Sequence, residues 1–285
     1  MEILLGLGAA LGWGGADFVA GTLARQIGSF RTLFFAQFVG FTALGGYALL
    51  TGLFAQLMGQ PPIVFAAAVA AALLNMISSF ALYRAFEVGL MAVVSPITAS
   101  YGALTAVFAF LSGERLPALR VIGVIAAIIG VMLTAAVITP DAFGQRSIKR
   151  GVLWAIMASL GYGVVFWLFG FHVTPYLGGV LPVFINRATT ILVLGTVCLI
   201  TRQSLKIPGR HEIARVIFIG TLDTVAYVAI LSGSTQGAVS IVTVLSSLYT
   251  TFTVVLAALL LHERLHRSQW FGVGLILVGI ILVSL

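Results

Sequence analysis

The chain has 285 residues, of which 60% are hydrophobic and 8% are charged, and its mean hydropathy is +1.15. This composition leaves too few polar side chains to cover a water-soluble globule of this size, so it excludes that class and predicts an integral membrane protein. The formal net charge is +7, but the basic residues lie at the ends of apolar segments and not in one solvated patch, so we predict no nucleic-acid partner.

Ten apolar segments are long enough to cross the roughly 30 Å of hydrocarbon in a bilayer as helices. In chain order they are residues 3–24, 32–53, 63–86, 91–111, 118–138, 151–171, 180–201, 213–234, 238–260 and 268–285. Each segment is apolar throughout and does not alternate between polar and apolar residues, which favours helices over the strands of a membrane barrel. We therefore predict an all-α polytopic membrane protein with ten transmembrane helices.

Two motifs of the first half recur in the second half, 149 residues further along. Gly-Glu-Arg-Leu at 113–116 recurs as His-Glu-Arg-Leu at 262–265, and Leu-Gly-Trp-Gly at 11–14 recurs as Leu-Gly-Tyr-Gly at 160–163. The recurrence predicts two five-helix repeats, residues 1–140 and 150–285. Because five is an odd number, the second repeat enters the membrane from the opposite face, so we predict that the repeats are inverted.

Inversion brings the middles of matching helices together at the centre of the bilayer. Three matched positions there hold polar or amphipathic aromatic side chains: Trp13 with Tyr162, Asn75 with Asp223, and Tyr101 with Tyr249. These residues come from the first, third, fourth, sixth, eighth and ninth helices, so we predict that these helices surround one central cavity. The fifth and tenth helices instead carry glycines spaced for close backbone approach, which predicts packing elements or the interface of a weak homodimer.

Three features together resemble the drug/metabolite transporter superfamily, and most closely its ten-helix EamA-type exporters. They are the two halves of about 140 residues, the Gly-Glu-Arg-Leu-Pro turn at 113–117 and the Leu-Gly-Trp-Gly opening at 11–14. Within that group the chain resembles the aromatic and neutral amino-acid exporter branch, although His266 replaces the proline in the second copy of the turn. The resemblance implies secondary transport without ATP through a central cavity lined by the six helices named above.

Two carboxylates fall inside predicted helices. Asp223 lies near the centre of the eighth helix, and Asp17 lies past the middle of the first. An ionised carboxylate there costs at least about 2.5–3.5 kcal/mol unless it is paired or hydrated, so each is a candidate for binding a substrate amine or carrying a proton. The alternatives are a structural hydrogen bond for Asp223 and, for Asp17, hydration near the interface with Arg25 or Arg31 as a partner.

Amide, guanidinium and aromatic groups complete the predicted site. Arg187 follows Asn186 in the seventh helix and could hold a substrate carboxylate, or could extend to the outer interface instead. Tryptophan and tyrosine in mid-helix cannot belong to an interfacial belt, so as a group they predict a cavity for an amphipathic solute. The predicted substrate-binding residues are Trp13, Asp17, Asn75, Tyr83, Tyr101, Tyr162, Asn186, Arg187, Asp223, Tyr227 and Tyr249.

The leading hypothesis is a secondary exporter of amino acids and related small amphipathic metabolites that works by alternating access in the plasma membrane, the inner membrane of a bacterium. The alternatives are a carrier of lipophilic cations or phosphorylated sugars, and a membrane-embedded enzyme or receptor. Nucleotide-binding motifs and metal-ligand spacings are missing from the sequence, so we predict no enzyme activity, no cofactor and no metal. Twelve of the fifteen basic residues fall on the side opposite both termini, so the positive-inside rule predicts that both termini lie outside the cytoplasm.

Overall fold

The computed structural model describes residues 1–89, 91–135, 145–206, 209–253 and 267–284. This part of the chain is helical and contains no strand. Seven helical segments of it, among them Val94–Leu111, are long and apolar enough to cross a membrane, and two shorter apolar helices accompany them. The prediction of an all-helical, multi-pass membrane protein is therefore confirmed.

The helices in chain order are α1 (Glu2–Ile27), α2 (Ser29–Thr51), α3 (Pro62–Val88), α4 (Met91–Ala99), α5 (Tyr101–Leu111), α6 (Ala118–Ala135), α7 (Gln145–Leu168), α8 (Thr174–Leu177), α9 (Leu181–Thr201), α10 (Arg210–Ser234), α11 (Val239–Ser247) and α13 (Arg267–Ser284). A 3-10 turn at Leu53–Leu57 follows α2, and a π-helical turn at Phe169–Val173 joins α7 to α8. Most bounds agree with the predicted apolar segments to within a few residues.

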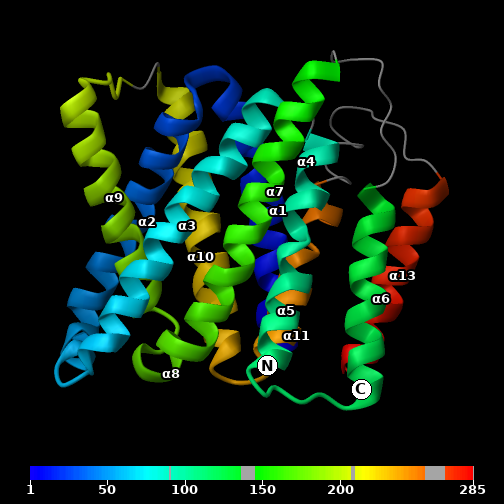
Figure 1. Cartoon of the computed structure of the whole chain (residues 1–285). Coiled ribbons are helices and arrows are strands. Elements are labelled where there is room, and N and C mark those ends of the chain that lie inside the picture. The colour runs from blue at the N-terminus through cyan, green and yellow to red at the C-terminus, as the bar shows by residue number, and fades with distance from the viewer. Residues whose placement is uncertain (90, 136–144, 207–208, 254–266, 285) are drawn as a thin grey trace.

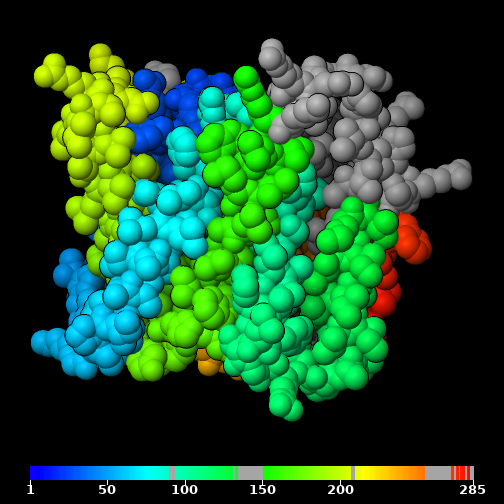
Figure 2. Space-filling view, in the orientation of Figure 1, coloured from blue at the N-terminus to red at the C-terminus, as the bar shows by residue number. Residues whose placement is uncertain are grey.

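The helices run side by side in one bundle (Figure 1). The closest neighbours are α1 with α10, α3 with α7, and α6 with α13. Large apolar side chains project outward, including Leu50, Leu111 and Leu199, each at least 80% exposed. An apolar outer face is what lipid requires. In Figure 2 the side chains of α3, α7, α5 and α6 follow one another across the face towards the viewer. The first residues of α1 and the last of α13 lie at the same end of the bundle (Figure 1).

Two of the predicted helices are interrupted. The segment 91–111 is not one continuous helix, because α4 ends at Ala99, Ser100 forms a turn and α5 begins at Tyr101. In the same way α11 ends at Ser247, Leu248 forms a turn, and helical residues resume at Tyr249. Both α4 and α11 are nine residues long. An interrupted helix releases backbone groups from helical hydrogen bonding, which a membrane protein tolerates only where the segment is buried in protein or lines a cavity.

The predicted glycine face of the fifth and tenth helices packs within the chain. A Cβ atom on Gly279 of α13 would stand 2.8 Å from the carbonyl oxygen of Gly123 and 2.7 Å from the backbone nitrogen of Ala127, both in α6. Only glycine permits so close an approach of two helix backbones. This contact explains Gly279 as a packing residue, and the weak homodimer stays a prediction.

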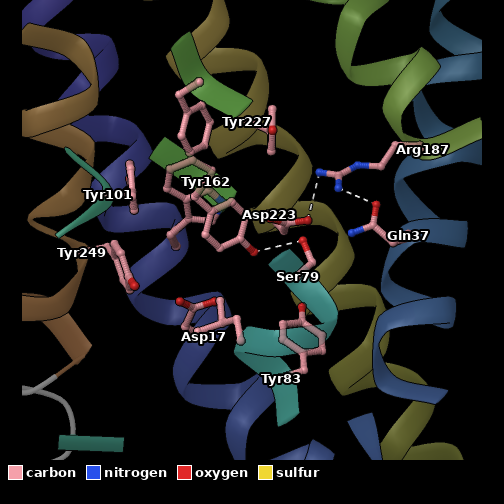
Figure 3. Close-up of a pocket in the computed structure, with 13 residues that line it drawn as sticks. Asp17, Gln37, Ser79, Tyr83, Tyr101, Tyr162, Arg187, Asp223, Tyr227 and Tyr249 are labelled. Atoms are coloured by element: carbon pink, nitrogen blue, oxygen red, sulfur yellow. Dashed lines mark hydrogen bonds and ion pairs between the residues drawn. The ribbon is translucent and has the colours of Figure 1, made fainter. Parts of the chain in front are cut away.

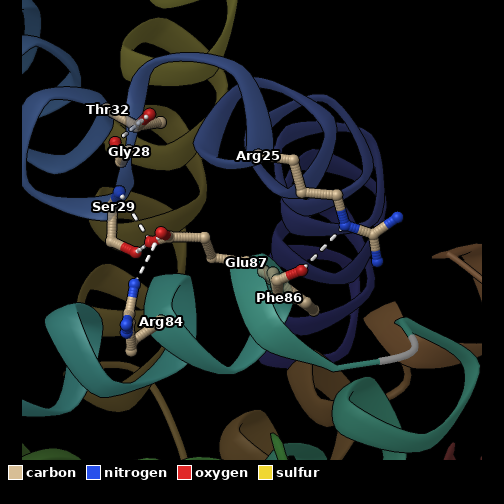
Figure 4. A network of polar contacts seen from close by, with 7 residues as sticks. All are labelled: Arg25, Gly28, Ser29, Thr32, Arg84, Phe86 and Glu87. Carbon is tan, nitrogen blue, oxygen red and sulfur yellow. Dashed lines mark hydrogen bonds and ion pairs between the residues drawn. The ribbon is translucent and has the colours of Figure 1, made fainter. Parts of the chain in front are cut away.

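Polar contacts tie the turn between α1 and α2 to the end of α3 (Figure 4). Glu87 accepts hydrogen bonds from the backbone and hydroxyl of Ser29, and forms an ion pair with Arg84 at 2.5 Å. Arg25 donates to the carbonyl oxygens of Phe86, at 3.0 Å, and Gly89, at 2.8 Å. These bonds join three helix ends on the side of the bundle opposite both termini.

At the other end of the bundle, Glu114 reaches from the turn after α5 to the first residues of α11. Its carboxylate accepts hydrogen bonds from the backbone nitrogens of Val239, at 2.8 Å, and Ser240, at 3.2 Å, and from the Ser240 hydroxyl. The first backbone N–H groups of a helix have no partner within the helix, and a carboxylate is favoured there by the helix dipole. The repeated Glu of the sequence motif therefore acts between distant helices in its first copy; the second copy, Glu263, lies outside the described residues.

Candidate functional site

A pocket lies inside the bundle (Figure 3). Its walls come from α1, α2, α3, α5, α7, α9 and α10 and from the segment that follows α11. The lining residues are Trp13, Asp17, Gln37, Ser79, Leu82, Tyr83, Tyr101, Tyr162, Phe166, Arg187, Asp223, Tyr227 and Tyr249. The structure thus brings together nine of the eleven predicted site residues, and only Asn75 and Asn186 are outside the lining.

Four helices each present two lining residues that are four positions apart. These pairs are Trp13 and Asp17 on α1, Ser79 and Tyr83 on α3, Tyr162 and Phe166 on α7, and Asp223 and Tyr227 on α10. Residues four apart lie on the same face of an α-helix, one turn apart along its axis. Each of these helices therefore lines the pocket over about one turn.

The aromatic part of the wall is centred on Phe166. The centre of its ring lies 5.0 Å from that of Tyr101, 5.4 Å from that of Tyr227 and 5.7 Å from that of Trp13. Tyr162 stacks on its other side at 6.1 Å. Three of these contacts are tilted and the one with Tyr162 is stacked, and together they give the pocket an apolar aromatic surface. Phe166 was not among the predicted site residues, because the prediction considered only tryptophan and tyrosine. Its position four residues after Tyr162 places it on the same helix face and could have indicated it.

Arg187 and Asp223 form an ion pair at one side of the pocket, with Nη2 2.9 Å from Oδ2. The Trp13 indole N–H donates to the other carboxylate oxygen at 2.8 Å, and Nη1 of Arg187 donates to Oε1 of Gln37 at 2.5 Å. The guanidinium carbon also lies 5.3 Å from the centre of the Tyr227 ring. Because the Arg187 side chain is 0% exposed, the alternative in which it extends to the outer interface is wrong.

The two asparagines lie behind the wall and support it. The Tyr227 hydroxyl donates to Oδ1 of Asn75 at 2.9 Å, and the Asn75 amide donates to Oδ1 of Asn186 at 3.2 Å. Both asparagines are buried. Their bonds hold the Tyr227 ring in place, which is a positioning role rather than direct contact with the pocket.

Asp17 differs from Asp223 because no partner holds it. Its side chain is buried, with 7% of the residue exposed, and it forms no hydrogen bond or ion pair with any residue that the structure describes. Arg25, one of the two partners considered from the sequence, instead donates to backbone carbonyls at the end of α3. The carboxylate therefore faces the pocket free to accept hydrogen bonds from a bound solute.

The charged groups of the pocket do not balance. Two carboxylates, Asp17 and Asp223, face one guanidinium, Arg187, so the lining carries one formal negative charge in excess. An aromatic pocket with an unpaired carboxyl group is suited to a solute with a positive group, which gains both from the carboxylate and from the ring faces. Across the described ranges, no three His, Cys, Asp or Glu side chains are grouped as they would be around a metal ion.

Gln37, Ser79 and Leu82 are further lining residues that sequence reasoning did not place. Gln37 is a polar residue of α2 whose side chain accepts the hydrogen bond from Arg187. Ser79 accepts a hydrogen bond from the Tyr162 hydroxyl at 2.9 Å. Gly40 leaves space for Thr224 and Arg187, since a Cβ atom there would stand 2.2 Å from Oγ1 of Thr224 and 3.1 Å from Nε of Arg187.

Comparison with known proteins agrees with this architecture. The sequence model of the EamA-like transporter family matches the chain twice, over residues 1–136 and 149–285. A solved structure described as "Crystal structure of protein" is similar over 99% of this chain and 96% of its own, with a TM-score of 0.75 and 18% sequence identity, which shows a shared fold. None of the curated protein sequences matches the chain. The chain thus belongs to the EamA-like transporter family of the drug/metabolite transporter superfamily, whose members are membrane transporters of small solutes.

Proposed function

We propose that the protein is a secondary exporter of small amphipathic metabolites that carry an amine, amino acids among them, and that it works by alternating access around the pocket. The observation that carries the proposal is the free Asp17 carboxylate in a buried, aromatic-lined pocket. The rings of Trp13, Phe166 and Tyr249 suit the apolar body of such a solute, and the carboxylate suits its ammonium group.

We also propose that ten helices form two inverted repeats, residues 1–140 and 150–285. Two structural features support this. The nine-residue helices α4 and α11 begin 148 residues apart, and each is followed by one turn residue and then by a tyrosine of the pocket, Tyr101 or Tyr249. Discontinuous helices at matching positions of two halves are typical of transporters that bind their substrate between inverted repeats. In addition, both ends of the chain lie at the same end of the bundle, as an even number of crossings requires (Figure 1).

Transport is tested with purified protein in liposomes and a panel of radiolabelled neutral and aromatic amino acids and amines. We expect saturable uptake without ATP, with a rate that responds to an imposed pH gradient if protons are the coupling ion. Phosphorylated sugars should neither cross nor compete, because the arginine of the pocket is already paired with Asp223. Uptake no faster than in protein-free liposomes for every solute would reject the proposal, and a hydrolysis screen on the same sample tests the alternative of an enzyme.

For the location we propose a bacterial inner membrane with both termini outside the cytoplasm. The basic start of α7, with Arg146, Lys149 and Arg150, and the basic segment between α9 and α10 would then be cytoplasmic. A cysteine introduced by Ser147→Cys in a Cys198→Ser background should resist an impermeant thiol reagent in intact cells and react after the membrane is opened. Reaction in intact cells would invert the orientation.

A further inference from the structure

We propose that the pocket selects primary amines that lack a carboxylate over the amino acids with the same side chain. This inference rests on the proposed function and specifies its substrate class. It follows from the pairing of the charged residues of the pocket. Asp17 has no ion-pair partner among the described residues, whereas Arg187 is already paired with Asp223.

The free acceptors lie together at one end of the pocket. Figure 3 shows Asp17 and Tyr83 at the end of the pocket away from Arg187. The Tyr83 side chain is 5% exposed, and its hydroxyl, like the Asp17 carboxylate, forms no hydrogen bond within the described residues. A primary ammonium group has three N–H donors. The carboxylate and the phenol oxygen together can accept two of them, and the rings around them favour the positive charge.

A substrate carboxylate has no comparable partner. The Arg187 guanidinium would have to release Asp223, and that would leave Asp223 without its counter-charge in a buried site. The free donors of the lining, the amide nitrogen of Gln37 and the hydroxyl of Tyr83, are neutral and so bind an anion less strongly than a guanidinium does. Nε of Arg187 also has no hydrogen-bond partner among the described residues, but it is fully buried beside Gly40.

The overall charge points the same way. With two carboxylates and one guanidinium in the lining, an ammonium ion brings the pocket to neutrality. A zwitterion brings the same ammonium group, but it also brings its own carboxylate. That carboxylate would lose its water on binding and would have no ion-pair partner in the pocket. The carboxylate of an amino acid should therefore weaken binding rather than strengthen it.

The test compares three solutes that share an indole ring: tryptamine, tryptophan and the neutral alcohol tryptophol. Binding is measured by titration calorimetry on the purified full-length protein, and transport by competition in liposomes. We expect tryptamine to bind at least about tenfold more tightly than either tryptophan or tryptophol, since it alone forms a charge pair that nothing opposes. In Asp17→Asn, tryptamine should bind no better than tryptophol. Glu212→Gln, which removes a carboxylate outside the pocket, should leave all three affinities unchanged.

Tryptophan binding as tightly as tryptamine, or tryptamine keeping its advantage in Asp17→Asn, would overturn the inference. In either case transport through the pocket would still be observed, so the proposed function would survive. Failure of all three solutes, and of every other solute in the panel, to bind or cross in a sample with a normal unfolding transition would reject the proposed function itself. If Asp17→Asn does not fold, Tyr83→Phe decides the question: it should weaken tryptamine about threefold and leave tryptophol unchanged.

Discussion

Arg187→Gln is expected to lower the free energy of unfolding by about 3–5 kcal/mol, because it leaves the Asp223 carboxylate in the protein interior without its counter-charge. Asp223→Asn should cost a similar amount, since it leaves the fully buried guanidinium unpaired. The double variant Arg187→Gln/Asp223→Asn replaces both charges with neutral amides, so it should be less destabilised than the sum of the two single variants. Unfolding of the protein in detergent micelles, followed by circular dichroism, measures all three values.

A second ion pair supplies the control for this cycle. Arg84 and Glu87 lie three residues apart at the end of α3, and the Arg84 side chain is 40% exposed. Arg84→Gln should therefore cost less than about 1 kcal/mol. Additive effects of Arg187→Gln and Asp223→Asn, each no larger than that of Arg84→Gln, would show that the buried pair contributes nothing to stability.

Glu114→Ala is expected to destabilise the protein by about 2–3 kcal/mol, because it removes the acceptor for two backbone N–H groups and one hydroxyl at the start of α11. Glu114→Gln keeps one acceptor oxygen but loses the charge that the helix dipole favours, so it should cost about 1 kcal/mol. Amide hydrogen exchange at Val239 and Ser240 should become faster in both variants, and more so in the alanine variant.

The neighbouring residue serves as the control for Glu114. Arg115 is exposed on the same turn, and Arg115→Gln should change stability by less than about 0.5 kcal/mol. Unchanged hydrogen exchange at the start of α11 in Glu114→Ala would mean that water replaces the carboxylate at no cost in free energy. The contact between Glu114 and α11 would then contribute nothing to stability.

Composition and hydropathy were enough to predict the class of fold. A continuous apolar run of about twenty residues must form its backbone hydrogen bonds internally in lipid, and a helix is the simple way to do so. For the same reason the depth of a residue along its helix can be read from its position in the run. Depth alone selected Trp13, Asp17, Tyr101, Tyr162 and Asp223, all of which line the pocket.

The direction of each side chain around its helix was not available from the sequence. A helix of a soluble protein shows its buried face as a stripe of apolar residues. These helices are apolar on all sides, so the sequence pattern does not predict which face is turned towards the pocket. Asn75 and Asn186 have the right depth and yet lie behind the pocket wall, whereas Gln37 and Phe166 lie in it. The turns at Ser100 and Leu248 were missed because hydropathy averages over a break of one residue.

Partners distant in the sequence were decided by tertiary structure alone. Arg187 and Asp223 are both charged and both at membrane depth, but only packing of α9 against α10 shows that they neutralise each other and leave Asp17 free. The amino-acid sequence by itself determined a membrane bundle, its repeated motifs and the depth of its polar groups, because these depend on local hydropathy and spacing. The folded structure decided which charges are paired. An ion pair depends on the approach of two helices, and the uniformly apolar surfaces of these helices do not predict which of them pack together.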